Sequence, residues 1–151
     1  MNESSSPPVP PGEVVRLRVI AGVFGFFSLI GAFDYVMVVT RNPDYFEYLG
    51  YGERQIAYFA NYPIPLAMLL TLSVWGTVLG SVLLLFRSRW AVYSLATALV
   101  SQTILDVITF AARDRWDVLG PRLGIQDGIV LLLTFGMCLY AVSLRRRRII
   151  R

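Results

Sequence analysis

The chain has 151 residues, of which 56% are hydrophobic, a larger share than soluble domains of this length carry, so we expect a membrane protein. One cysteine and no histidine exclude an internal disulfide framework, zinc sites of Cys and His, and His-ligated haem. The formal charge of +4 comes largely from RRRR at 145–148 and from Arg151. A basic run directly after an apolar helix is typical of a topology signal that meets anionic lipid, so we expect no nucleic-acid partner.

Four apolar segments follow a polar, proline-rich start. Residues 1–15 have too few apolar side chains to bury, which predicts a disordered tail. Crossing the hydrocarbon takes about 20 mostly apolar residues in a helix. The segments that meet this length are 17–39, 63–86, 90–112 and 125–144. We therefore predict an all-α fold, a four-helix integral membrane bundle over residues 16–144, followed by a basic tail at 145–151.

The arginines predict the orientation of the four spans. With an even number of spans, both termini lie on the same side of the membrane. Nine arginines belong to that side and five to the other, and the positive-inside rule then places both termini in the cytoplasm. The nine are Arg16, Arg18, Arg87, Arg89, Arg145, Arg146, Arg147, Arg148 and Arg151, and the five are Arg41, Arg54, Arg113, Arg115 and Arg122.

The long loop after the first span is predicted to contain two short helices. Asn42 can cap a helix that has Pro43 at its first position and ends at Gly50. A second helix from Glu53 would turn Gln55 toward water.

Aromatic side chains are frequent in this loop, and amphipathic rings favour the headgroup layer of a membrane. We expect the loop to lie as an interfacial lid over the outer end of the bundle. The predicted lid residues are Tyr45, Tyr48, Tyr51, Tyr58 and Phe59.

Small residues in the second span predict close helix packing. Gly76 and Gly80 are four residues apart, and Ser81 follows directly. Small residues at this spacing let two helices approach closely in lipid. Ala21 and Gly25 of the first span belong to a similar ridge that could receive them.

Polar residues of three spans are predicted to meet at one depth. Asp34 lies about 8 to 9 Å below the outer end of the first span, at 1.5 Å per residue, and Asp106 lies at a similar depth in the third. Asp127 begins the fourth. A charged side chain facing lipid is costly, so these groups should face the bundle interior. The predicted polar cluster consists of Asp34, Gln102, Asp106, Thr109, Arg113, Gln126 and Asp127.

Two accounts of this cluster are open from the sequence. In the structural account, Asp34 and Asp106 pair with Arg41, Arg113 or Arg122 and hold the helices in register. In the functional account, the carboxyl groups line an outward-opening pocket or a proton-binding site.

The runs GAFDYVMVVTRN, AYFANYP and VWGTVLGSVLLLFRSRWAV resemble small uncharacterised four-helix bacterial membrane proteins near the DoxX-like superfamily, over about residues 20–95. The resemblance implies a bacterial inner-membrane protein connected with membrane redox complexes or stress responses; some relatives carry sugar-transporter labels. Those relatives commonly have a glutamate in the second helix, where this chain has Trp75.

Functional expectations follow from these features together. The sequence contains no nucleophile and base pair, phosphate-binding glycine loop or metal-ligand set, so enzymatic activity is not indicated. We expect an accessory or partner subunit of an inner-membrane complex, in contact with the bilayer and with a second copy or other membrane proteins. No cofactor is evident, and a quinone or a lipid are the candidate ligands. The alternative is an oligomeric small-solute or proton-coupled transporter that uses the carboxylate cluster.

Overall fold

The computed structural model describes residues 10–150, and this part of the chain consists of α-helices without any strand. The elements are α1 (Pro11–Val39), α2 (Pro43–Tyr48), α3 (Glu53–Ala60), α4 (Ile64–Leu85), α5 (Trp90–Ala112) and α6 (Arg115–Arg146). Four of them, α1, α4, α5 and α6, are long and apolar enough to cross a membrane. The predicted all-α class and the four long apolar helices are thus confirmed for the described residues.

Two of the long helices extend beyond the predicted spans. α1 begins at Pro11, where proline occupies the first helical position and Glu13 follows in the first turn. α6 begins at Arg115 and is interrupted by Gly120, whose φ of 80° and ψ of 169° are not helical. The differences arise because apolar composition marks the part of a helix suited to lipid, not the ends of the helix. Residues 1–9 of the predicted disordered tail lie outside the described residues.

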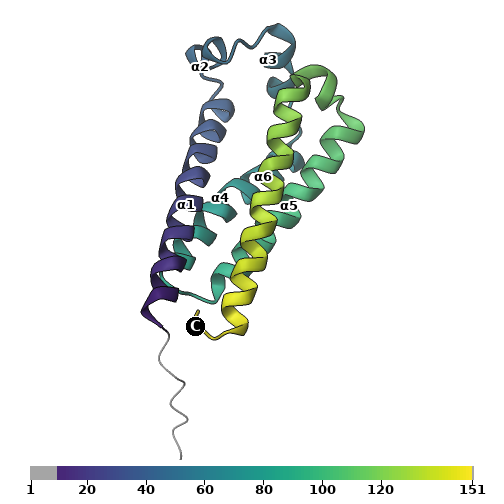
Figure 1. Ribbon diagram of the computed structural model, residues 1–151. Helices are drawn as coiled ribbons and strands as arrows, with labels where there is room; N and C mark the ends of the chain where they lie inside the picture. Colours follow the sequence, from purple (N-terminus) through teal and green to yellow (C-terminus); the bar gives the residue numbers. More distant parts are fainter. Residues whose placement is uncertain (1–9, 151) are drawn as a thin grey trace, which may run out of the picture.

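The four long helices pack in the order α1, α4, α5, α6. The short helices α2 and α3 lie together at one end of the molecule, which we call the loop end (Figure 1). The start of α1 and the end of α6 lie at the opposite end, which we call the terminal end. Because α1 and α6 are the two outer members of the packing series, the face between them is where the interior can open.

The glycines of α4 form its closest contact with α5. A Cβ atom added to Gly76 would lie 2.9 Å from the Cβ of Ala98, and one added to Gly80 would lie 2.7 Å from the side chain of Leu95. The Ser94 hydroxyl donates a hydrogen bond to the Gly76 carbonyl at 2.8 Å. The two glycines therefore receive α5 and not the small-residue ridge of α1.

The small-residue ridge of α1 packs against Ser81 of α4, and not against the two glycines. A Cβ atom added to Gly25 would lie 3.3 Å from the Cβ of Ser81. The hydroxyl of Ser81 donates to the Thr77 carbonyl of its own helix at 2.7 Å, so the contact between Ser81 and Gly25 is one of shape. α4 thus uses its small residues on two neighbours at once.

The last described residues close the terminal end. Ile149 and Ile150 are each 3% exposed and belong to the main apolar core, where the sequence analysis expected a basic tail outside the bundle. Arg148, with a φ of 57°, reverses the chain, and the Ile149 amide donates to the Leu144 carbonyl at 3.0 Å. Arg87 donates two hydrogen bonds to the Ile149 carbonyl, at 2.9 and 3.1 Å. The two isoleucines were not expected here because they follow four consecutive arginines.

We expect Ile149→Ala to destabilise the protein by about 2 kcal/mol, because it removes buried methyl groups from a packed cluster. Ile64→Ala is the matched control, since Ile64 is 76% exposed and the same atoms are lost from a site with few contacts. Thermal unfolding in one detergent, followed by tryptophan fluorescence, measures both variants. Equal unfolding temperatures for the two would contradict the packed closure.

Candidate functional site

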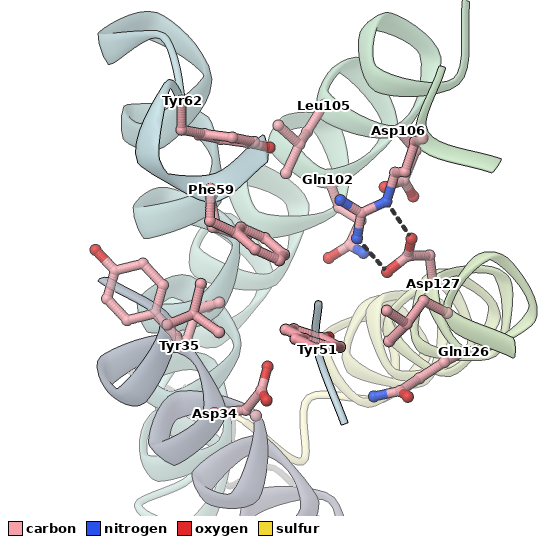
Figure 2. A pocket seen from close by; sticks show the side chains of 16 residues that line it. Asp34, Tyr35, Tyr51, Phe59, Tyr62, Gln102, Leu105, Asp106, Gln126 and Asp127 are labelled. Atoms are coloured by element: carbon pink, nitrogen blue, oxygen red, sulfur yellow. Dashed lines mark hydrogen bonds and ion pairs between the residues drawn. The ribbon is translucent and has the colours of Figure 1, made fainter. Parts of the chain in front are cut away.

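A cavity of about 120 Å³ lies at the loop end between α1 and α6, with α4 and α5 behind it; we call it the loop-end cavity. Its polar wall consists of Asp34, Gln102, Asp106, Arg115, Gln126 and Asp127. Its cover is aromatic and consists of Tyr51, Phe59 and Tyr62. Figure 2 shows Asp34 on one side of the cavity and Asp106 and Asp127 on the other, with Tyr51 between them. Five residues of the predicted polar cluster thus share one cavity.

Asp34 is held by the first short helix. The Tyr45 hydroxyl donates a hydrogen bond of 2.6 Å to Oδ1 of Asp34. Tyr45 is positioned because the side chain of Asn42 caps α2 and accepts from the Tyr45 amide at 3.0 Å. Burial, followed by this hydrogen bond, raises the pKa of Tyr45 above its ordinary value, so the hydroxyl remains a donor. Asp34 is thereby fixed at the wall of the loop-end cavity.

Asp127 forms a bidentate ion pair with Arg115, which the sequence analysis placed in a loop and not in the cluster. The Arg115 Nε and Nη2 atoms donate to the two carboxylate oxygens at 2.7 and 3.1 Å. The side chains are only 16% and 18% exposed. In an unbroken helix, residues twelve apart would lie about 18 Å from each other. The contact therefore depends on the non-helical break at Gly120.

Asp106 and Gln102 supply the α5 wall of the cavity. The Gln102 Oε1 atom accepts a hydrogen bond from Ser73 of α4 at 2.6 Å, which fixes the amide between the two helices. Asp106 lies one turn farther along α5 and is half-buried. Among residues 10–150, neither Asp34 nor Asp106 forms an ion pair.

The arginines of the structural account are engaged elsewhere or exposed. Arg41 donates to the Ala60 carbonyl at 3.0 Å, and Arg113 donates to the Tyr58 carbonyl at 3.3 Å. Arg122 is exposed. The expected pairing of Asp34 or Asp106 with these three arginines is therefore not formed within the described chain. Arginine in this region binds the backbone of the lid because the carbonyls at the ends of short helices lack helical partners.

No protein-family model, curated protein or solved structure matches the chain. The resemblance to the DoxX-like superfamily therefore stays a prediction. Within residues 10–150, no group of three or more His, Cys, Asp or Glu side chains is placed to hold a metal ion.

Two members of the predicted polar cluster lie outside the cavity wall. Thr109 is fully buried, and its hydroxyl donates to the Leu105 carbonyl at 2.8 Å. The guanidinium of Arg113 lies 4.6 Å from the ring centroid of Tyr58 and 5.0 Å from that of Tyr62. Thr109 therefore serves its own helix, and Arg113 stabilises the lid by cation–π contact.

The aromatic lid is organised around Phe46, which the sequence analysis did not select. Phe46 is 3% exposed, and its ring centroid lies 5.7 Å from that of Tyr51 and 6.3 Å from that of Phe59. Tyr58 is also buried, at 7% exposure, whereas Tyr48 is 84% exposed and lies outside the lid. Tyr48 differs from the expectation because α2 turns another face, that of Phe46, toward Tyr51 and Phe59.

Gln55, which was expected to face water, joins α3 to α6. The Gln55 amide nitrogen donates to the Val118 carbonyl at 3.1 Å, and its oxygen accepts from the Gly52 amide at 3.1 Å. Tyr62 completes this side of the lid, and burial raises its pKa to about 12. Tyr62 is thus uncharged at neutral pH and adds a neutral hydroxyl to the cavity.

A second cavity, of about 100 Å³, lies next to the first on the side of the terminal end; we call it the lower cavity. The two cavities share Gly31, Val74 and Gln102 as lining residues. The rim of the lower cavity includes Phe27 of α1 and Leu133 of α6, which are 59% and 50% exposed. The lower cavity therefore opens sideways between α1 and α6.

Hydroxyl groups line the lower cavity but are already hydrogen-bonded within the protein. The four donors are Ser28 to the Phe24 carbonyl, Ser73 to Gln102, Thr77 to the Val74 carbonyl and Thr134 to the Val130 carbonyl, over 2.6 to 2.9 Å. A hydroxyl that donates to its own helix exposes mainly its carbon atoms to a neighbour. The lower cavity is thus apolar in effect, in contrast to the loop-end cavity above it.

Proposed function

We propose that this chain is a multi-pass protein of the bacterial inner membrane, with both termini in the cytoplasm, and that it is an accessory or partner subunit of a membrane complex. In this role it holds a membrane-embedded small molecule in the loop-end cavity, which faces the outer side. The four long apolar helices and the distribution of arginines support this placement. The resemblance to the DoxX-like superfamily points to the same compartment.

The observation that carries the proposal is that the interior has cavities toward the loop end and is closed at the terminal end. The loop-end and lower cavities are neighbours with three shared lining residues, whereas the terminal end is filled by a packed core that includes Leu17, Leu84, Leu95, Ile149 and Ile150. A cavity that is polar at one end, apolar beyond it and closed below suits binding of an amphiphilic molecule better than passage of a solute.

The alternative is an oligomeric transporter, and the positions of Asp34 and Asp106 favour it. These carboxyl groups reach the same cavity from α1 and α5 and form no ion pair in the described chain. Unpaired carboxyl groups at membrane depth often bind and release protons or cations. A pathway across this chain would require the core of the terminal end to separate.

The two functions are distinguished by the double variant Asp34→Asn with Asp106→Asn. We expect it to lose a bound small molecule or a protein partner during purification in mild detergent, as followed by native mass spectrometry. We expect proton and solute flux in proteoliposomes to be at the background level with and without the substitutions.

Asp44→Asn is the matched control, because Asp44 is exposed on α2 and the substitution removes the same charge outside the cavity. It should retain whatever the unmodified protein retains. Flux that is present in the unmodified protein and abolished only in the double variant would replace the accessory role by transport.

A further inference from the structure

The loop-end cavity is rich in hydrogen-bond acceptors and carries an excess of formal negative charge. Three carboxyl groups, Asp34, Asp106 and Asp127, face it together with a single guanidinium, that of Arg115. Arg115 is already committed to both oxygens of Asp127. A ligand headgroup therefore meets the carboxyl groups of Asp34 and Asp106 as the charged groups still open to it.

This arrangement discriminates between classes of headgroup. A phosphate or carboxylate would be repelled by the two carboxyl groups, and like charges across a binding surface cost several kcal/mol. A quinone offers carbonyl oxygens, which accept hydrogen bonds and cannot donate to a carboxylate. An ammonium group supplies both the opposite charge and the donors.

The aromatic cover of the cavity is also suited to a cation. Tyr51 and Phe59 lie with ring centroids 6.0 Å apart and an interplanar angle of 15°, and both line the cavity. Ring faces attract ammonium groups, and this attraction is larger where water is excluded. In the same lid, Tyr58 and Tyr62 already hold the guanidinium of Arg113.

The lining of the lower cavity indicates that the group attached to the headgroup is a hydrocarbon chain. The lower cavity shares Gly31 and Gln102 with the loop-end cavity, and its hydroxyls are used within the protein. A hydrocarbon chain loses nothing by lying against such a wall, and the sideways opening between Phe27 and Leu133 admits it from the bilayer. The two cavities have volumes of about 120 and 100 Å³, which suit a small head and the first part of one chain, the rest of which can extend through the sideways opening into the bilayer.

We infer that the two cavities form one site for a membrane amphiphile with an ammonium headgroup, which enters between α1 and α6, places its ammonium between Asp34 and Asp106, and lays the first part of its hydrocarbon chain in the lower cavity. This inference rests on the proposed function and names the class of its ligand. It makes the quinone that the sequence left open less suited to the site than an ammonium compound.

The experiment uses the full chain in nanodiscs of phosphatidylglycerol, which has no amine. Four probes are added separately at one concentration: dodecylammonium, dodecanol, dodecanoate and decylubiquinone. Native mass spectrometry measures the fraction of protein that retains one probe molecule. We expect dodecylammonium to be retained at least tenfold more than each of the others, and we expect Asp34→Asn with Asp106→Asn to reduce its retention to that of dodecanol. Asp44→Asn should leave retention unchanged.

A second variant tests the chain-binding part independently of the carboxyl groups. Gly31 lines both cavities, and a Cβ atom added to it meets no atom within 4 Å, so Gly31→Leu is compatible with folding and fills the shared space. It should lower the retention of dodecylammonium at least tenfold, and ethylammonium at the same concentration should not displace dodecylammonium from the unmodified protein. Full retention in this variant, or displacement by ethylammonium, would overturn the amphiphile site in favour of a free amine.

The outcomes also separate this inference from the proposed function. Preferred retention of decylubiquinone, dodecanol or dodecanoate overturns the ammonium headgroup and leaves a membrane-ligand site in place. Retention of none of the four probes overturns both the ligand class and the binding role.

Discussion

Arg115→Ala should lower the free energy of unfolding by about 3 kcal/mol, one of the two largest effects that we expect from a single substitution. Removing one partner of a buried ion pair costs about 3 to 5 kcal/mol, because the other charge remains without compensation. The Arg115 and Asp127 side chains are 16% and 18% exposed, which places the pair at the lower end of this range. Unfolding in a single detergent, followed by tryptophan fluorescence, measures the change.

Two further variants identify the cause of the loss. Arg122→Ala removes an arginine that is exposed on the same helix and should change stability by less than about 0.5 kcal/mol. Arg115→Ala combined with Asp127→Ala should recover most of the stability, because no charge is then left without a partner. If the double variant is no more stable than Arg115→Ala, the ion pair is not the source of the effect.

Gly76→Leu should destabilise the protein by about 3 kcal/mol, at the upper end of the range for overpacked sites. A Cβ atom at this position would already lie 2.9 Å from the Cβ of Ala98 and 3.3 Å from the Ser94 carbonyl oxygen, which is backbone and cannot turn away. α4 and α5 would have to separate, and the hydrogen bond from Ser94 to the Gly76 carbonyl would be lost. The measurement is again the unfolding transition in detergent.

Gly136→Leu is the control for this prediction. Gly136 lies within α6, and a Cβ atom added there meets no atom within 4 Å. The same change in helix propensity and side-chain size should therefore leave the monomer as stable as the unmodified protein or slightly more stable. A loss for Gly136→Leu as large as that for Gly76→Leu would show that added bulk, and not the contact with α5, is responsible.

The long helices and the first short helix could be predicted because their signals are local. Length and apolar composition identify a spanning helix, and the Asn42 cap with Pro43 at the first position identifies α2. Asp34, Asp106 and Asp127 were expected at one depth because helical rise converts sequence position into depth, and the structure places all three around one cavity.

Features that depend on where the chain reverses could not be predicted. Arg115 reaches Asp127 only through the break at Gly120, and helical spacing gives no sign of it. Ile149 was assigned to a basic tail, because a run of charges hides an apolar residue that follows a turn. Phe46 was missed among the neighbouring tyrosines, since a helix of six residues is too short for its buried face to be recognised.

Each of the two polar contacts that orient the carboxyl groups of Asp34 and Asp127 joins residues that are close in the sequence. Tyr45 lies eleven residues after Asp34, and Arg115 lies twelve residues before Asp127. Closing loops of this length costs little chain entropy, so each contact can form within its own segment before distant helices meet. The α1 wall and the α6 wall are then prepared separately, and the site arises when they are brought together. Between residues 10 and 150 the ion pair from α1 toward the end of α6 is the exposed one of Glu13 and Arg147 at 3.8 Å, so neither of the two contacts that orient the carboxyl groups depends on a link between the walls.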